Sequence, residues 1–583
     1  MTASNRLRPL RRGLGLAFGA LVVLAAPHSP LSITTPAWAQ SDGAPLSLFP
    51  QPDAAPGTTG PGSPGAGTGI QVLPADPVLR PSTDAFRGIE VRDLGGPDPD
   101  ATGLLGPGTG GLGQGMWQST SQDVALDLLQ RLPVAASSRA MQDLMRRLLL
   151  STATPPVVTR PGQAAEGGIL TPLRIDRLFA MGRLDDVARF VAALPADSRT
   201  PALERHRTDA LLLVGQTDAA CETAMAANEE DDDPYWQKVL VFCDLLAGRA
   251  DQAALGMSLL REMGHEDGVF FKLAETLGGL SDSPPKTVEV PDALVIALYR
   301  ATNLPLPAEY AETALPWVDL AVALTGSAEP LLRLQTGERA EAAGALPSDA
   351  LRFMYADMPF PEEAYARPLS EVAGVTSPEN RALLLQMASD LNSDAERARA
   401  LSIGLYTARA SGATAYLTLS RALGPLMRSV PPDPRLTADG TALARALYAA
   451  DDLDAAQAWI AALTVHVETN RVVADALEEL KLFNAMAEGQ TVTLPWPTPQ
   501  GDGEPGSFDP VVLDRLYEAS SRGAVAETVA LAMIAIGPGG PTAAHGQSLD
   551  AALKALHRVG LRRAAGAIAL EAALTRWTTN SAD

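Results

Sequence analysis

Three stretches of the chain align with one another without a gap, and they decide the expected fold: Gly182-Arg183-Leu184-Asp185-Asp186-Val187-Ala188, Gly215-Gln216-Thr217-Asp218-Ala219-Ala220 and Gly248-Arg249-Ala250-Asp251-Gln252-Ala253-Ala254. Successive glycines are 33 residues apart, and each lies between two stretches whose apolar residues recur three and four positions apart, as in amphipathic helices. We expect each glycine to take the left-handed conformation that ends one helix, and the aspartate three residues later to cap the next helix. A small Val or Ala two positions further on permits close helix packing. The three stretches therefore predict helix–turn–helix units.

Helical patterns continue on both sides of these units. Related turns occur at residues 451–456, 523–526 and 560–565, and apolar residues keep the helical spacing from Trp117 onward. Alternation of the strand type is almost absent, apart from short pieces near 288–290 and 491–494. The sequence therefore predicts an all-α fold.

The period of the repeat carries a resemblance to a known family. A helix, a turn and a helix in each unit, at a period near 33 to 34, resembles the tetratricopeptide repeat superfamily. The turn pattern G-x-x-D-x-A occurs three times in register, whereas the family's early aromatic and closing proline are mostly missing, so a looser helical solenoid is the alternative. The resemblance implies a solenoid of helical hairpins over residues 117–488, with the clearest repeats at 171–264. Such arrays expose a long concave face that commonly binds a partner.

The start of the chain has the three zones of a secretory signal peptide over residues 1–39. Basic residues come first, an apolar run from Leu14 to Ala26 follows, and Ala37-Trp38-Ala39 precedes the expected cleavage after Ala39. The apolar run is too short to span a bilayer, and no later stretch has eighteen apolar residues. We expect export to the bacterial periplasm by the ordinary route, with the twin-arginine route as the less favoured alternative, and no transmembrane segment in the mature chain.

Two breaks in the helical pattern suggest the domain boundaries. Residues 40–116 read as a disordered tether, since 29 of residues 41–116 are Gly or Pro and such a segment buries too little apolar surface to fold. Residues 489–509 interrupt the helices with further Pro and Gly and read as a linker or long loop. Residues 510–577 would then form a C-terminal helical unit or the cap of the solenoid.

The charge of the chain restricts its partners. Lys and Arg number 46 against 68 Asp and Glu, which gives a formal net charge of −22, or −26 after removal of the four arginines in the signal peptide. A protein this acidic is repelled by phosphate backbones and by anionic lipid headgroups. We therefore expect neither a nucleic acid nor a membrane surface as the partner.

The chain has two cysteines, Cys221 and Cys243. The helical patterns on either side of residues 228–233 predict an antiparallel hairpin, and across it the two cysteines lie within one helical turn of facing each other. An oxidising periplasm would let them pair. Two buried free thiols are the alternative, and a metal site is less favoured still, because no histidine lies near either cysteine in the sequence.

The sequence contains no catalytic or metal-binding motif that we recognise. His265-Glu266-Asp267 begins like a zinc-protease helix but lacks the second histidine four residues on, and the other histidines show no ligand spacing. The acidic run before Pro234 is interpreted as a turn, with Asp233 as helix cap. Glu518 faintly resembles the catalytic glutamate of lytic transglycosylases, but the serine and phenylalanine that should follow it are missing. We expect no catalysis, no cofactor and no metal.

Export and the repeat pattern together suggest a function. Our first hypothesis is a secreted periplasmic helical-repeat scaffold that binds a protein or peptide partner in the bacterial envelope. The alternative is an envelope enzyme, or an enzyme accessory, that acts on peptidoglycan and uses the helical array to position its substrate. A structural tether that docks to a larger assembly is a third possibility.

The resemblance also implies where a partner would bind. If the repeated glycines occupy the turn between the two helices of each unit, the first helix of the third unit runs over residues 234–247, and a set of residues on two helices faces the groove. These residues are Arg205, Asp209, Leu212, Tyr235, Lys238, Phe242 and Leu245. Cations beside aromatic rings suit an acidic or C-terminal peptide, because they combine charge-assisted bonds with rigid contact area. The alternative is that Phe242 and Leu245 belong to the core.

Overall fold

The computed structural model describes residues 98–157, 168–229, 231–281, 283–286, 290–313, 315–492, 496 and 508–576. The expected signal peptide and residues 40–97 of the expected tether lie outside these ranges. All described residues belong to one compact unit, residues 92–583. Within the described residues the fold is all-α, without strands, and two isolated bridges join Leu105 to Ser151 and Ser121 to Val157.

The first half of the described chain folds into helices that mostly contact their sequence neighbours. They are α1 (Gln122–Gln130), α2 (Arg139–Leu150), α3 (Leu170–Ala180), α4 (Leu184–Ala193), α5 (Pro201–Leu213), α6 (Thr217–Asn228), α7 (Pro234–Leu246), α8 (Ala250–Glu262), α9 (Gly268–Leu277), α10 (Ala293–Thr302), α11 (Pro316–Ala323), α12 (Pro330–Ala342) and α13 (Ser348–Asp357). Short 3-10 helices lie at Pro99–Ala101, Pro107–Thr109, Ala196–Ser198 and Ala308–Glu312.

The second half continues in the same way. Its helices are α14 (Glu362–Tyr365), α15 (Leu369–Ala373), α16 (Pro378–Ser389), α17 (Asp394–Ser411), α18 (Ala413–Arg428), α19 (Thr437–Ala449), α20 (Leu453–Leu463), α21 (Arg471–Ala487), α22 (Pro510–Arg522), α23 (Val525–Ile536), α24 (Gly540–Ala543), α25 (Gly546–Arg558) and α26 (Arg562–Arg576), with a 3-10 helix at Thr464–His466. Most of the expected linker, residues 489–509, lies outside the described residues. None of the described helices combines enough length and hydrophobicity to cross a bilayer.

The repeated glycines lie where the sequence placed them, at the turns of the α3–α4, α5–α6 and α7–α8 hairpins. Gly182, Gly215 and Gly248 have φ angles of 71°, 80° and 72°, in the left-handed region that suits glycine. The small residues five positions on, among them Val187, are fully buried between the paired helices. The predicted hairpins are therefore present.

The predicted role of the repeated aspartates is wrong. Asp185 lies inside the first turn of α4, whose N-cap is Arg183, and no side chain caps that helix; α6 and α8 begin in the same way. Each helix starts two residues earlier than the capping pattern requires. The aspartates therefore lie in the first helical turn, where a negative charge interacts favourably with the helix dipole without closing a cap.

Residues 98–116 differ from the expected tether, because they pack against the helices. The Asp100 carboxylate accepts hydrogen bonds from the backbone N–H groups of Gly168, Leu170 and Thr171 at 3.1, 3.1 and 2.7 Å. The buried Arg174 guanidinium donates to the carbonyl of Thr102 at 2.8 Å. Glycine content alone predicted disorder here, but these buried charged anchors stabilise the segment, so the ordered chain begins earlier than Trp117.

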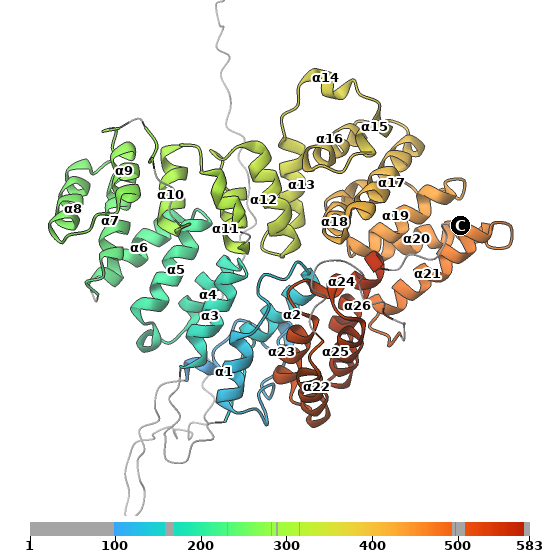
Figure 1. The fold of residues 1–583 in the computed structure, drawn as a ribbon, viewed down its shortest axis with the longest axis horizontal. Coiled ribbons are helices and arrows are strands. Elements are labelled where there is room, and N and C mark those ends of the chain that lie inside the picture. The colour runs from blue at the N-terminus through green and yellow to red at the C-terminus, as the bar shows by residue number, and fades with distance from the viewer. Residues whose placement is uncertain are drawn as a thin grey trace, which may run out of the picture. The chain divides into compact units, whose positions relative to one another are not determined.

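The chain returns on itself, so that its two described ends lie side by side. Helix α10 packs on α5, and α11 contacts α3. At the end of the chain α23 packs on α1 and α2, and α26 packs on α2, as the red and blue helices of Figure 1 show. The Ser138 hydroxyl donates to the Glu571 carboxylate at 2.5 Å across 433 residues of sequence. We call this contact between α1–α2 and α22–α26 the junction.

Candidate functional site: a mixed-charge pocket at three helix N-termini

Three of the predicted groove residues meet in one pocket. Arg205 on α5, and Tyr235 and Lys238 on α7, line a cavity of about 360 Å³. The remaining walls come from the start of α7, from the residues around the start of α9, and from the start of α10. They are Asp233, Pro234, His265, Asp267, Phe270, Asp292, Leu294 and Val295. We call this cavity the groove pocket.

The N-termini of α7, α9 and α10 converge on the groove pocket, and each is capped by an aspartate. Asp233 accepts from the N–H of Tyr235 at 2.8 Å, Asp267 from that of Phe270 at 2.9 Å, and Asp292 from that of Leu294 at 2.9 Å. A cap of this kind contributes about 1 kcal/mol to its helix. The predicted cap at Asp233, with Pro234 at the first helical position, is confirmed. These three carboxylates offset the partial positive charge of three helix dipoles.

The two cations of the pocket are already engaged with carboxylates. The Arg205 guanidinium lies 4.2 Å from the centroid of the Tyr235 ring and 3.7 Å from Asp233 Oδ2. Lys238 Nζ lies 2.8 Å from Asp267 Oδ2. The pocket therefore offers positive and negative groups side by side, with each cation lying over a ring, Arg205 over Tyr235 and Lys238 over Phe270. It is less cationic than the sequence indicated.

Asp209 lies behind this wall and is the pocket's pH-sensitive neighbour. The Tyr235 hydroxyl donates to Asp209 Oδ1 at 2.6 Å. Burial raises the pKa of Asp209 to about 7, a shift that the negative charge of Asp292 reinforces and the hydrogen bond from Tyr235 opposes. Burial together with Asp209 also raises the pKa of Tyr235 well above its ordinary value. The aromatic wall is thus held by a carboxyl that titrates near neutral pH.

The apolar residues of the predicted groove do not face the pocket. Leu212 and Phe242 are core residues with 1% and 2% of their surface exposed, and Leu245 is half-buried near Gly278. Their side chains are turned inward because each helix buries its apolar stripe against its neighbours. The alternative that Phe242 belongs to the core is therefore the observed one.

Sequence reasoning placed three of the eleven lining residues of the pocket in the groove. It did not place His265, Asp292, Leu294 or Val295 there, because α9 and α10 do not belong to the glycine repeat. One local signal was available, since Asp292 directly precedes the apolar run that opens α10, which is the pattern of a capped helix start. Nothing local in the sequence shows that α10 folds back onto α5.

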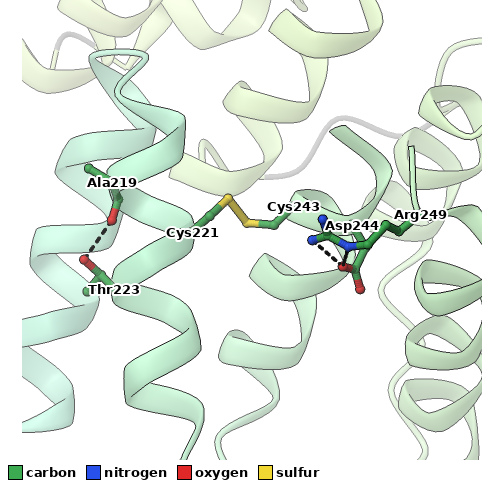
Figure 2. Close-up of a disulfide and its surroundings, with 6 residues drawn as sticks. All are labelled: Ala219, Cys221, Thr223, Cys243, Asp244 and Arg249. Atoms are coloured by element: carbon green, nitrogen blue, oxygen red, sulfur yellow. Dashed lines mark hydrogen bonds and ion pairs between the residues drawn. A yellow bond between two sulfur atoms is a disulfide. The ribbon is translucent and has the colours of Figure 1, made fainter. Parts of the chain in front are cut away.

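The two cysteines are joined by a disulfide. It links Cys221 of α6 to Cys243 of α7 with their Cα atoms 5.9 Å apart, as Figure 2 shows. Beside it the Asp244 carboxylate accepts from the Arg249 guanidinium at 2.8 Å. The disulfide ties α7, which carries Tyr235 and Lys238, to the preceding hairpin.

Other candidates from the sequence do not form a site. Glu518 is a solvent-facing residue of α22, with 68% of its side chain exposed and Arg522 at 4.0 Å. Within the described residues, no group of three His, Cys, Asp or Glu side chains has the arrangement of a metal site.

Comparisons with protein families, curated proteins and solved structures find no match to this chain.

Proposed function

We propose that this chain is a secreted, periplasmic helical-repeat protein of the bacterial envelope, and that its groove pocket binds a protein or peptide partner without catalysis. Three left-handed glycine turns at a period of 33 residues support a repeat array similar to tetratricopeptide proteins. The observation that carries the proposal is the meeting of Arg205, Tyr235 and Lys238 with three capped helix N-termini in one pocket.

The pocket's charges indicate how such a partner would bind. An acidic side chain or a C-terminal carboxylate would replace Asp233 beside Arg205, or Asp267 beside Lys238, and the exchange of one solvent-accessible ion pair for another changes the free energy little. The Tyr235 and Phe270 rings are buried in the free chain, with 6% and 1% of their surface exposed, so they hold the two cations in place and add little contact area for a partner. The ion pairs would select the partner's charge pattern.

A pair of double variants tests this proposal. Changing Arg205→Ala and Lys238→Ala should weaken the binding of a partner that co-purifies with the exported chain by at least about 1 kcal/mol, which is roughly fivefold. The matched control is Arg471→Ala with Lys481→Ala on α21, which removes the same two side-chain types where 94% and 64% of the side chain is exposed. In both variants the free energy of unfolding should stay within about 0.5 kcal/mol of that of the unmodified protein.

Two results would contradict the proposal. One is equal affinity for the partner in both double variants, which would place the contact elsewhere on the protein. The other is turnover of purified cell wall by the chain, which would favour the peptidoglycan alternative. Because Glu518 faces solvent, we do not propose that alternative here.

A further inference from the structure

A second cavity, of about 650 Å³, lies at the junction, where segments far apart in the sequence converge. Its walls come from α2, the start of α13, α18, the end of α19 and α26. The volume is within the range of roughly 300 to 1,000 Å³ that is typical of small-molecule sites. We call it the junction cavity, and it shares no lining residue with the groove pocket.

Arginine supplies the positive charge of the junction cavity. Five guanidinium groups line it although the chain as a whole is strongly acidic; they belong to Arg139, Arg147, Arg421, Arg428 and Arg563. Among the described residues, no lysine or histidine lines the cavity. Arginine is suited to bind a carboxylate or phosphate, because its planar group offers two parallel donors.

Several of these arginines keep donors for a further acceptor. Arg139 and Arg421 share one carboxylate, that of the fully buried Glu341, to which they donate at 2.8 and 2.7 Å. Arg147 donates one bond to the Gly110 carbonyl at 2.7 Å. Among the described residues, Arg563 has no ion-pair partner within 4 Å. Arg428 pairs with Asp452, so two carboxylates, those of Glu341 and Asp452, satisfy three of the five arginines.

Four carboxylates also line the cavity, and two of them are already engaged. Glu571 accepts from the Ser138 hydroxyl at 2.5 Å and from the Ala140 N–H at 3.0 Å, and so caps α2. Asp349 pairs with Arg352 at 3.1 Å. Asp143 and Asp451 are exposed at the cavity. The lining thus holds two arginines without a carboxylate partner among the described residues, Arg147 and Arg563, beside two exposed carboxylates, Asp143 and Asp451.

One wall of the junction cavity is apolar. Ala564, Ala567, Leu570 and Leu574 follow one another at helical spacing along a single face of α26, and Leu417 of α18 also lines the cavity. The small side chains of Ala564 and Ala567, in the first half of α26, leave space that larger side chains would occupy. The cavity therefore combines a guanidinium cluster with a hydrocarbon surface.

We propose that the junction cavity binds a small organic anion with an apolar body, a carboxylate-bearing amphiphile. The carboxylate takes donors from the arginine cluster, and the body of the ligand lies against the apolar face of α26. Because α2, α18 and α26 all contribute, an occupied cavity links the two ends of the described chain. This site is independent of the groove pocket.

Calorimetric titration of the purified chain with decanoate, below its micelle-forming concentration, tests the proposal. Decanoate should bind and raise the melting temperature. Decylamine, which carries the same body with the opposite charge, should bind at least about tenfold more weakly, as loss of a charge-assisted bond predicts. Inorganic phosphate, which has the charge and no body, should also bind more weakly. Absence of decanoate binding, or equal binding of either control ligand, would overturn the proposal.

Two neighbouring arginines on α26 provide matched variants. Arg563→Ala should weaken decanoate about tenfold, whereas Arg562→Ala, which removes an exposed guanidinium that does not line the cavity, should leave the affinity unchanged. Ala567→Trp should obstruct the apolar wall of the cavity and weaken decanoate binding. Where this variant also unfolds the protein, the comparison of the two arginine variants decides. Equal losses in both arginine variants would show that the anion binds outside the cavity.

Discussion

Two acidic side chains with little exposure, one in the repeat hairpins and one beside the junction, show how differently two regions of this fold treat a negative charge. Asp209 of α5 has a tyrosine hydroxyl as its hydrogen-bond donor, and burial raises its pKa to about 7. Glu341 of α12 is fully buried, yet its pKa is lowered, because the charges and hydrogen bonds of Arg421 and Arg139 outweigh the burial. Pairing, and not depth, decides which carboxylate stays ionised.

The two carboxylates give stability opposite dependences on pH. The stability that ionised Glu341 provides is present above its ordinary pKa and is lost as the pH falls through its lowered value. Asp209 behaves in the reverse manner: the folded state binds its proton more tightly than the unfolded state does, so stability decreases as the pH rises from about 4 to about 7. Acid should therefore loosen the contacts around Glu341 before it affects the hairpins.

The largest expected effect is at Glu341. Glu341→Gln removes the charge that Arg139 and Arg421 share and leaves two guanidinium groups with little compensation, so we expect a loss of about 3 kcal/mol at pH 7. Urea unfolding followed by circular dichroism measures it. Glu518→Gln, the same substitution at an exposed position, should change stability by less than about 0.5 kcal/mol. A variant as stable as its control would mean that the arginines find other partners.

A smaller effect of opposite sign is expected at Asp209. Asp209→Asn keeps an acceptor for the Tyr235 hydroxyl but cannot ionise, so at pH 8 it avoids the cost of a poorly solvated charge. The pKa of about 7, in place of 3.8, sets an upper limit of about 4 kcal/mol on the gain in the free energy of unfolding. We expect a gain of about 1 to 2 kcal/mol, because the residue keeps part of its exposure. The gain should be smaller at pH 5 and vanish only near pH 4, at the ordinary pKa of the group. The urea midpoints of the variant and the unmodified chain at pH 8 and pH 5 measure this gain. A gain that is smaller at pH 8 than at pH 5 would contradict the raised pKa of Asp209.

The smallest effect separates backbone conformation from packing. Gly248→Ala should cost about 1 kcal/mol, because an added Cβ meets no atom within 4 Å and the left-handed backbone alone is penalised. Gly182→Ala has the same backbone angle, but its Cβ would lie 2.8 Å from that of Ala345 and 3.1 Å from the Pro316 carbonyl oxygen. It should therefore cost more in the same unfolding measurement. Equal losses would show that the neighbouring residues yield without cost.

The sequence was informative where the determinants of structure are local. The left-handed turns at Gly182, Gly215 and Gly248 depend on a few adjacent residues, and the period made them visible. Asp451, which has a φ of 59° at a related turn, shows that the turn geometry can occur without glycine. The capping error has a similar local cause, since a shift of two residues moved each aspartate from the cap into the helix.

The sequence was uninformative where distant segments meet. The bond between Ser138 and Glu571, and the shared ion pairs of Glu341 with Arg139 and Arg421, join helices that have no common pattern. For the groove pocket, helical spacing identified Arg205, Tyr235 and Lys238, but it also selected Leu212 and Phe242. Spacing defines a stripe on a helix, and only the packing of α9 and α10 decides which part of that stripe remains open.

The disulfide between α6 and α7 has a consequence for the acidic turn that it spans. A protease that cuts between Asp231 and Asp233 would break the backbone, but Cys221 and Cys243 lie on opposite sides of the cut and would hold the two pieces together. The nicked protein would run as one band on a denaturing gel without reductant and as two bands with it. In an oxidising compartment, this chain can lose backbone continuity beside its groove pocket and still remain one covalent molecule.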